Sequence, residues 1–160
     1  MKLPLFRTLL VTACLAIFSL PLHAQLVTKT TLSLELAKKI AAKAEAEAAK
    51  NKWTMVIAIV DDGGNLIYLA KMDGTQIGSI DVAQEKARTA LKFKRPTKVF
   101  EDVVAGGRTA ILSLPGVVAI EGGLPLVVDG AYVGAIGVSG MKSTEDGVAA
   151  EAGASVLAKK

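Results

Sequence analysis

Two tight turns, one in each half of the chain, restrict how this sequence can fold. Asp61-Asp62-Gly63-Gly64-Asn65 separates two β-prone runs, and Asp129-Gly130 separates two others. Asp-Gly and Gly-Gly pairs readily adopt the positive-φ conformations that tight hairpin turns require. We therefore expect two antiparallel hairpins. Their strands are predicted over Met55 to Val60, Leu66 to Ala70, Leu124 to Val128 and Tyr132 to Val138.

Four further stretches have the spacing and end signals of helices. The first has apolar residues at helical spacing. The second begins at Ser79 and is ended by Pro96, and the third is stopped by Gly106-Gly107. The last has acidic residues in its first turn, which suits the positive end of a helix. The predicted helices are Ser33 to Asn51, Ser79 to Pro96, Lys98 to Ala105, and Ser143 or Thr144 to Ala158.

The arrangement of these segments selects a fold class. Hairpins on both sides of a helical middle do not make alternating βαβ units, which disfavours a doubly wound nucleotide-binding fold. One more short strand is predicted over Val117 to Ile120. The sequence therefore predicts an α/β protein of the α+β type, with a single antiparallel five-stranded sheet flanked by helices, in the order αββααβββα.

The first 24 residues have the three parts of a secretory signal peptide. Lys2 and Arg7 form a basic start, an apolar run extends from Thr8 to Leu22, and Ala24 precedes the expected cut. We therefore expect residues 25–160 to be exported as one domain, to a periplasmic or secreted location. An alternative reading makes Cys14 a lipoprotein processing site, although the apolar run continues well beyond it.

Loss of the leader restricts the chemistry of the mature chain. Cys14 and His23 are the only cysteine and histidine, so Ser-His-Asp, Cys-His and histidine or cysteine zinc sites are excluded from residues 25–160. The formal charge falls from +4 to +2, because Lys2 and Arg7 are also lost, and aromatic content is 4%. We expect no nucleic acid partner and, since no apolar run reaches about 20 residues, no stable membrane insertion.

Two motifs near the last predicted helix resemble catalytic signatures and fail on inspection. Gly137 to Ser143 is similar to a phosphate loop, but Met141 precedes Lys142 where a glycine is required. Ser139 and Lys142 have Ser-x-x-Lys spacing, but Gly140 intervenes and the companion motifs of that enzyme class are missing. We assign no catalytic residue and treat an enzymatic role as uncertain.

Basic residues in the middle of the chain are the stronger binding candidates. Arg88, Lys92 and Arg95 stand at i, i+4 and i+7, which places three positive groups along one side of the second predicted helix. They could receive carboxylates or form a solvated helix face. Arg108 could join an anion site or neutralise nearby helix carbonyls.

Several phrases together resemble one family. They are Val60 to Leu66, Met72-Asp73-Gly74, Lys86 to Ala90, Gly122 to Pro125, and Gly134 to Gly140. Over about residues 31 to 158 the chain resembles the GlcG/HbpS-like heme-binding family, also called domain of unknown function 336. The resemblance implies an antiparallel sheet flanked by helices and self-assembly into a homo-oligomer. It also implies heme, or in some relatives a cobalamin-related compound, as a ligand.

The chain departs from relatives that bind heme iron through histidine. Asn65 stands where many family members carry histidine in the first hairpin. Any bound heme must therefore use an oxygen or sulfur ligand, water or a partner. The candidate ligands are Tyr68, Met72, Thr97 and Tyr132.

The function predicted from the sequence is that of an exported small-ligand-binding protein, heme-binding or heme-responsive without histidine ligation. Two alternatives stay open. One is an enzyme or carrier for a small carboxylate, and the other is a structural homo-oligomer without a small ligand.

Overall fold

The computed structural model describes residues 28–158. The expected leader, with Cys14 and His23, lies outside these residues. Within the described range, no helix is long and apolar enough to cross a membrane.

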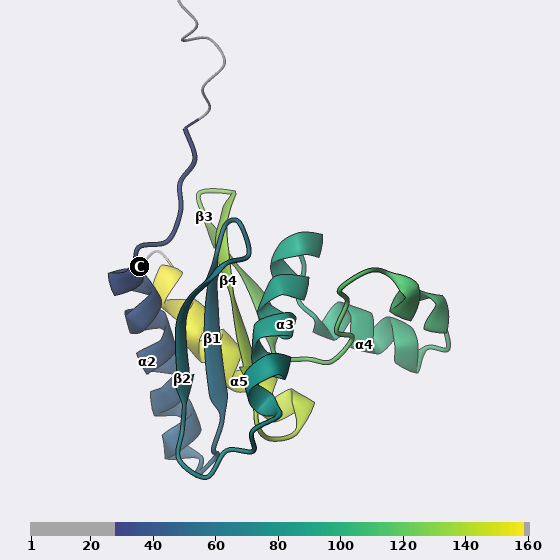
Figure 1. The fold of residues 1–160 in the computed structure, drawn as a ribbon, viewed down its shortest axis with the longest axis horizontal. Coiled ribbons are helices and arrows are strands. Elements are labelled where there is room, and N and C mark those ends of the chain that lie inside the picture. The colour runs from purple at the N-terminus through teal and green to yellow at the C-terminus, as the bar shows by residue number, and fades with distance from the viewer. Residues whose placement is uncertain (1–27, 159–160) are drawn as a thin grey trace, which may run out of the picture.

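The described residues form one antiparallel sheet with helices on both faces (Figure 1). The strands β1 (Val56–Asp61), β2 (Leu66–Lys71), β3 (Gly123–Val128) and β4 (Ala131–Ser139) lie in the order β2-β1-β4-β3. One face packs against α2 (Leu34–Lys50) and α5 (Ser143–Ala154), which is followed by the short η4 (Ser155–Leu157). The other face packs against α3 (Ser79–Phe93).

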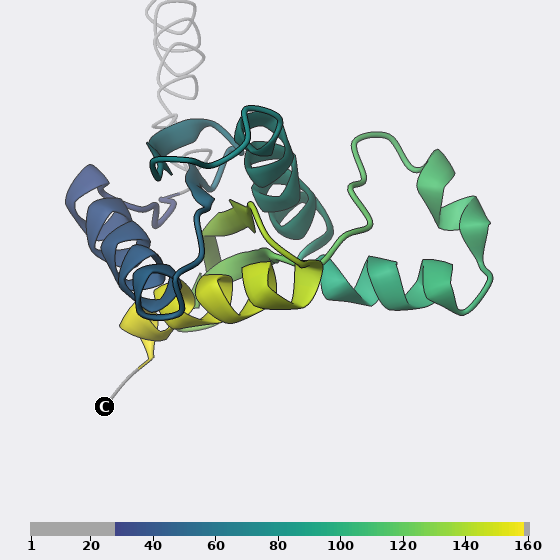
Figure 2. The same cartoon turned by 90° about the horizontal axis from the view of Figure 1, so that it is seen from below.

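An arm projects from the end of α3. It consists of α4 (Lys98–Ala105), the 3₁₀ helix η3 (Thr109–Ser113) and the chain that returns to the sheet. Figure 2 shows this arm extending away from the body of the sheet and helices. Phe100 is the buried residue of α4, and its ring packs edge-to-face on Phe93 at the end of α3, with centroids 5.3 Å apart.

The central strand β1 is covered on both faces, which explains why its sequence is continuously apolar. Ile57 and Ile59 enter the core formed with α2 and α5. Val56, Ala58 and Val60 face α3. Helix α3 presents alanines to this face and lies very close to the sheet. A Cβ on Gly137 of β4 would stand 1.9 Å from the carbonyl oxygen of Ala83.

The predicted hairpins are confirmed, but the number of strands is not. The sheet has four strands in the described residues, and Val117 to Ile120 forms no strand. Side-chain oxygens accept hydrogen bonds from the backbone N–H groups that would otherwise pair with a neighbouring strand. The Thr89 hydroxyl accepts the N–H of Val118, and the Glu101 carboxylate accepts the N–H of Glu121. With these donors satisfied, the segment runs as a connection along α3 and α4.

The predicted helices are confirmed with changes at two ends. The last one is shorter than predicted, because α5 ends at Ala154 and the 3₁₀ helix η4 follows it. The other change is at the end of α3. This helix stops at Phe93, and Lys94 adopts a left-handed conformation with φ 53° and ψ 41°. Arg95 therefore does not continue the predicted stripe along the helix. Its Nε donates to the Phe93 carbonyl, and its guanidinium lies 5.8 Å from the Phe100 ring centroid.

A buried ion pair joins α3, the end of β4 and α5. Lys86 Nζ lies 2.7 Å from Asp146 Oδ2 and donates to the Val138 carbonyl at 3.0 Å. Both side chains are almost fully buried, at 1% and 3% exposed. The other Asp146 oxygen accepts the N–H of Met141. Burial raises the pKa of Asp146, and the Lys86 ammonium opposes that rise.

Breaking this pair on one side should be costly. Asp146→Asn leaves the Lys86 ammonium buried without a counter-charge, so we expect the free energy of unfolding to fall by about 3 kcal/mol or more. Adding Lys86→Met should recover much of that loss. Urea unfolding of both single variants and the double variant measures the coupling, and additive effects within about 0.5 kcal/mol would contradict it.

Candidate ligand-binding cleft

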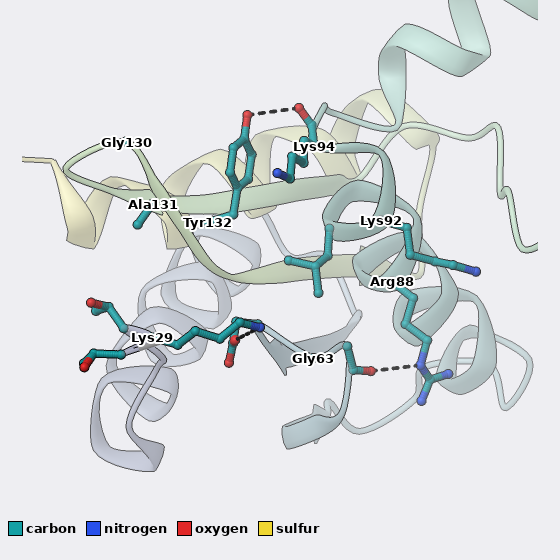
Figure 3. A pocket seen from close by; sticks show the side chains of 13 residues that line it. Lys29, Gly63, Arg88, Lys92, Lys94, Gly130, Ala131 and Tyr132 are labelled. Carbon is teal, nitrogen blue, oxygen red and sulfur yellow. Dashed lines mark hydrogen bonds and ion pairs between the residues drawn. The ribbon is translucent and has the colours of Figure 1, made fainter. Parts of the chain in front are cut away.

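A cleft of about 720 Å³ opens where two hairpin turns meet α3 (Figure 3). Its walls are the β1–β2 turn, the second half of α3, the β3–β4 turn and residues 28–30. The volume lies within the range of about 300–1,000 Å³ typical of small-molecule sites. Each hairpin turn therefore joins two strands and also forms one wall of the cleft.

The β1–β2 turn is held in shape by one carboxylate. Asp61 Oδ1 accepts the N–H groups of Gly63 and Asn65, both at 2.9 Å. The Asn65 side-chain amide donates to the same carboxylate at 3.1 and 3.2 Å. Asn65 is thus engaged within the turn and does not replace a histidine as an iron ligand.

Two of the predicted basic residues line the cleft from α3. Arg88 Nε donates to the Gly64 carbonyl at 3.3 Å, and its guanidinium pairs with Glu85. Lys92 is exposed and donates to the Pro115 carbonyl at 3.4 Å. Arg88 is therefore held by the protein, whereas Lys92 can turn toward a ligand.

A third basic residue reaches the cleft from the amino-terminal segment. Lys29 Nζ lies 3.0 Å from Asp62 Oδ2 in the β1–β2 turn. Hydrogen bonds from Thr31 and from Lys29 hold the pKa of Asp62 below its usual value. This ion pair ties the segment to the turn and neutralises the acidic side chain that lines the cleft.

Tyr132 and Lys94 form the opposite wall. The Tyr132 hydroxyl donates to the Lys94 carbonyl at 3.3 Å, and Lys94 Nζ lies 5.1 Å from the centre of the Tyr132 ring. Leu91 supplies an apolar surface between this pair and Gly64. The cleft thus combines four basic side chains with an aromatic ring and its hydroxyl.

The remaining predicted ligand residues lie elsewhere. Thr97 is fully buried, and its hydroxyl accepts the Gly123 N–H at 2.9 Å to hold the start of β3. Tyr68 and Met72 pack against the core formed with α2 and α5. Arg108 is exposed on the arm, just before η3. Of the four predicted iron ligands, the structure places Tyr132 in the cleft.

Among the basic residues of the cleft, Lys29 and Lys94 were not predicted from the sequence. Both lie outside helices and strands, so hydrophobic periodicity gives no signal for them. Lys94 follows the last residue of α3, where a left-handed residue turns the chain. The Pro96 two residues beyond is the signal that could have placed a helix end there.

A second, smaller hollow of about 170 Å³ lies beside the arm and is lined by acidic side chains. They are Asp102, Glu121 and Glu151, with Lys98 paired to Asp102 at 2.7 Å. Burial and the neighbouring carboxylates raise the pKa of Glu121, against the lowering effect of Lys98. The described residues contain no group of three or more histidine, cysteine or acidic side chains placed to hold a metal.

Comparison with known proteins assigns the family. The family described as "Haem degrading protein HbpS-like" matches residues 32–155. The chain belongs to this family. It is 46% identical over 132 residues to protein GlcG of Escherichia coli K12, covering 82% of this chain and 98% of GlcG.

Solved HbpS-like structures have the same fold. A double mutant of HbpS from Streptomyces reticuli has a TM-score of 0.78 at 35% identity, covering 85% of this chain and 93% of that one. A complex of PduOC with heme has a TM-score of 0.74 at 27% identity, covering 80% and 96%. The HbpS-like fold therefore includes a structure that holds heme.

The acidic hollow of this HbpS-like chain predicts a pH-dependent stability. A raised pKa means that folded Glu121 binds its proton more tightly than the unfolded chain does. Its contribution to stability therefore falls as pH rises above the ordinary value of 4.5. We expect Glu121→Gln to stabilise the protein at pH 7 by less than about 1 kcal/mol. Thermal unfolding of the wild type and the variant at pH 4 and pH 7 measures this stabilisation. An equal increase in stability at both pH values would contradict the raised pKa of Glu121.

Proposed function

We propose that this chain is an exported heme-binding protein that holds heme in the cleft between the two hairpin turns and α3. One observation carries the proposal: the fold brings Tyr132 together with basic side chains from α3 and from residues flanking it. Family membership and the heme complex of a relative at 27% identity support the choice of ligand.

The donor chemistry of the cleft fits heme iron without histidine. Residues 25–160 contain no histidine or cysteine. A tyrosine oxygen is an established protein ligand of heme iron. Tyr132 lines the cleft, and its hydroxyl, which donates to the Lys94 carbonyl at 3.3 Å, would give up this hydrogen bond to bind iron. Asp62 is less available, because Lys29 and Thr31 already bind its carboxylate.

The basic side chains fit the two propionates of heme. Lys92 and Lys94 are exposed, and neither forms an ion pair among those found in residues 28–158. Arg88 presents a guanidinium fixed by Gly64 and Glu85. Leu91 offers apolar surface for the ring. Bound heme would supply a redox-active iron centre, and the chain's own residues would orient the ring and balance its charge.

Titration with hemin tests this proposal. We expect the mature protein to give a saturable Soret shift at micromolar concentration. Tyr132→Phe keeps the ring but removes the oxygen ligand, so hemin affinity should fall about tenfold or more, equivalent to about 1.4 kcal/mol. Resonance Raman bands of an iron phenolate should also be lost.

A matched pair of arginine variants serves as the control. Arg88→Gln removes a charge in the cleft and should weaken hemin binding severalfold. Arg95→Gln removes the same charge beside Phe100, outside the cleft, and should leave the affinity unchanged. Equal affinities for the wild type, Tyr132→Phe and Arg88→Gln would refute binding in this cleft.

A small organic carboxylate is the second candidate ligand. The basic side chains would receive its charge, and nothing in that interaction needs the Tyr132 hydroxyl. A thermal-shift panel of small organic acids distinguishes the two. Stabilisation by an acid that is undiminished in Tyr132→Phe would favour the carboxylate, and stabilisation by hemin alone would favour heme.

Export rests on the sequence of residues 1–24, which precede the described residues. We infer that the leader is removed and that the cleft works in the periplasm or outside the cell. The mass of the protein recovered from a periplasmic fraction checks the cut after Ala24. An intact leader on a cytoplasmic protein would contradict export.

Self-association is also proposed, because the arm carries exposed apolar side chains. They are Val99, Leu112, Leu114 and Ile120, between 37% and 54% exposed. Apolar surface of this kind is normally covered at an interface, and a second copy of the chain is the partner that the family resemblance implies. Leu112→Asp with Leu114→Asp should shift sedimentation toward monomer. A wild type that is already monomeric at micromolar concentration would overturn this.

A further inference from the structure

Lys94 stands at a backbone position where glycine is the favoured residue. It is the C-cap residue of α3, with φ 53°. The N–H of Lys94 donates to the Leu91 carbonyl, and the N–H of Arg95 donates to the Ala90 carbonyl. A left-handed residue at this place is usually glycine, because a Cβ strains the conformation. The chain therefore carries a local stability cost at Lys94.

Glycine occupies most of the positive-φ positions in the described residues. Three are not glycine: Lys52, Lys94 and Asp129. Asp129 begins the Asp-Gly turn of the second hairpin, where its residue type is favoured. Lys52 is exposed just beyond α2 and does not line the cleft. Lys94 is the lysine of this group that enters the cleft.

Both the backbone carbonyl and the side-chain ammonium of Lys94 contact Tyr132. Its carbonyl accepts the Tyr132 hydroxyl, and its ammonium lies 5.1 Å from the ring centre, within the range of a cation–π contact. The two contacts fix the ring at two points. Lys94 directly follows α3 and Tyr132 lies on β4, so these two contacts join the end of the helix to the sheet.

We infer that Lys94 sets the specificity of the cleft for a planar ring that carries carboxylates, in preference to small aliphatic carboxylates. This rests on the proposed function. The ordered Tyr132 ring and the neighbouring Leu91 give a flat ligand an apolar surface, and the Lys94 ammonium meets its carboxylates. A small aliphatic acid gains the charge of Lys94 but nothing from the ordered ring. Selective binding is thus the functional reason for a lysine at a position where glycine would make the fold more stable.

The test uses two probes and four variants. Metal-free protoporphyrin IX reports recognition of the ring without an iron bond, and succinate reports recognition of carboxylate charge. We expect Lys94→Gly to weaken protoporphyrin IX binding about fivefold more than succinate binding, because only the planar probe uses the ordered Tyr132 ring. Lys94→Arg keeps a cation over the ring and should restore the preference. Lys92→Ala removes a charge that does not touch Tyr132 and should weaken both probes equally.

Stability provides the second readout. Lys52→Gly should raise the melting temperature by about 3 °C, because it removes the strain of a Cβ at a left-handed position. It should not change binding, since Lys52 does not line the cleft. Lys94→Gly should keep the melting temperature at or above that of the wild type while the preference for the ring falls. A Lys94→Gly variant that is less stable than the wild type would overturn the inference by making Lys94 a structural residue.

The binding outcomes separate this inference from the proposed function. A wild type that binds hemin but shows the same probe preference as Lys94→Gly overturns the role of Lys94 and leaves heme binding intact. A wild type that binds neither hemin nor protoporphyrin IX overturns both. An arginine variant as poorly selective as the glycine variant also contradicts the role assigned to the cation.

Discussion

The close packing of α3 on the sheet positions the helical wall of the candidate site. Gly137 leaves room for the backbone of α3 at Ala83, and a side chain there would collide with the helix. The buried pair of Lys86 and Asp146 then fixes the same helix to β4 and α5. Because the second half of α3 forms a wall of the cleft, these contacts also determine where Arg88 and Lys92 stand relative to the two hairpin turns.

Much of this fold could be predicted from local sequence. The hairpin turns depend on residues within a few positions of each other. For example, the Asp61 carboxylate accepts the N–H groups of Gly63 and Asn65. The helices follow from apolar spacing and from glycine stops. The predicted strand at Val117 to Ile120 is absent for a non-local reason. Thr89 accepts the N–H of Val118 within this segment, and Glu101 accepts the N–H of Glu121 just after it, from 29 and 20 residues away.

The candidate site was predictable only in part. Arg88 and Lys92 share a helix face with regular spacing, and the structure places both in the cleft. Arg95 has the same spacing but leaves the helix at the left-handed Lys94. Thr97 reads as a possible ligand in the sequence, yet its hydroxyl holds Gly123 in a buried contact. Such outcomes depend on tertiary packing, which residue type and spacing do not report.

The absence of histidine from residues 25–160 gives the site its chemical character. It makes an oxygen ligand the natural choice for iron and directs attention to the tyrosine that the second hairpin presents beside α3. The same cleft places a lysine against that tyrosine at a cost in backbone strain. Ligand identity and local stability are therefore linked through one pair of side chains.

A crystal structure of the mature protein grown with hemin tests the central claim most directly. The account predicts the macrocycle between the β1–β2 turn, α3 and the β3–β4 turn, with the Tyr132 oxygen bound to iron. A macrocycle seated against Tyr68 and Met72 on the other face, or beside the arm, would contradict it.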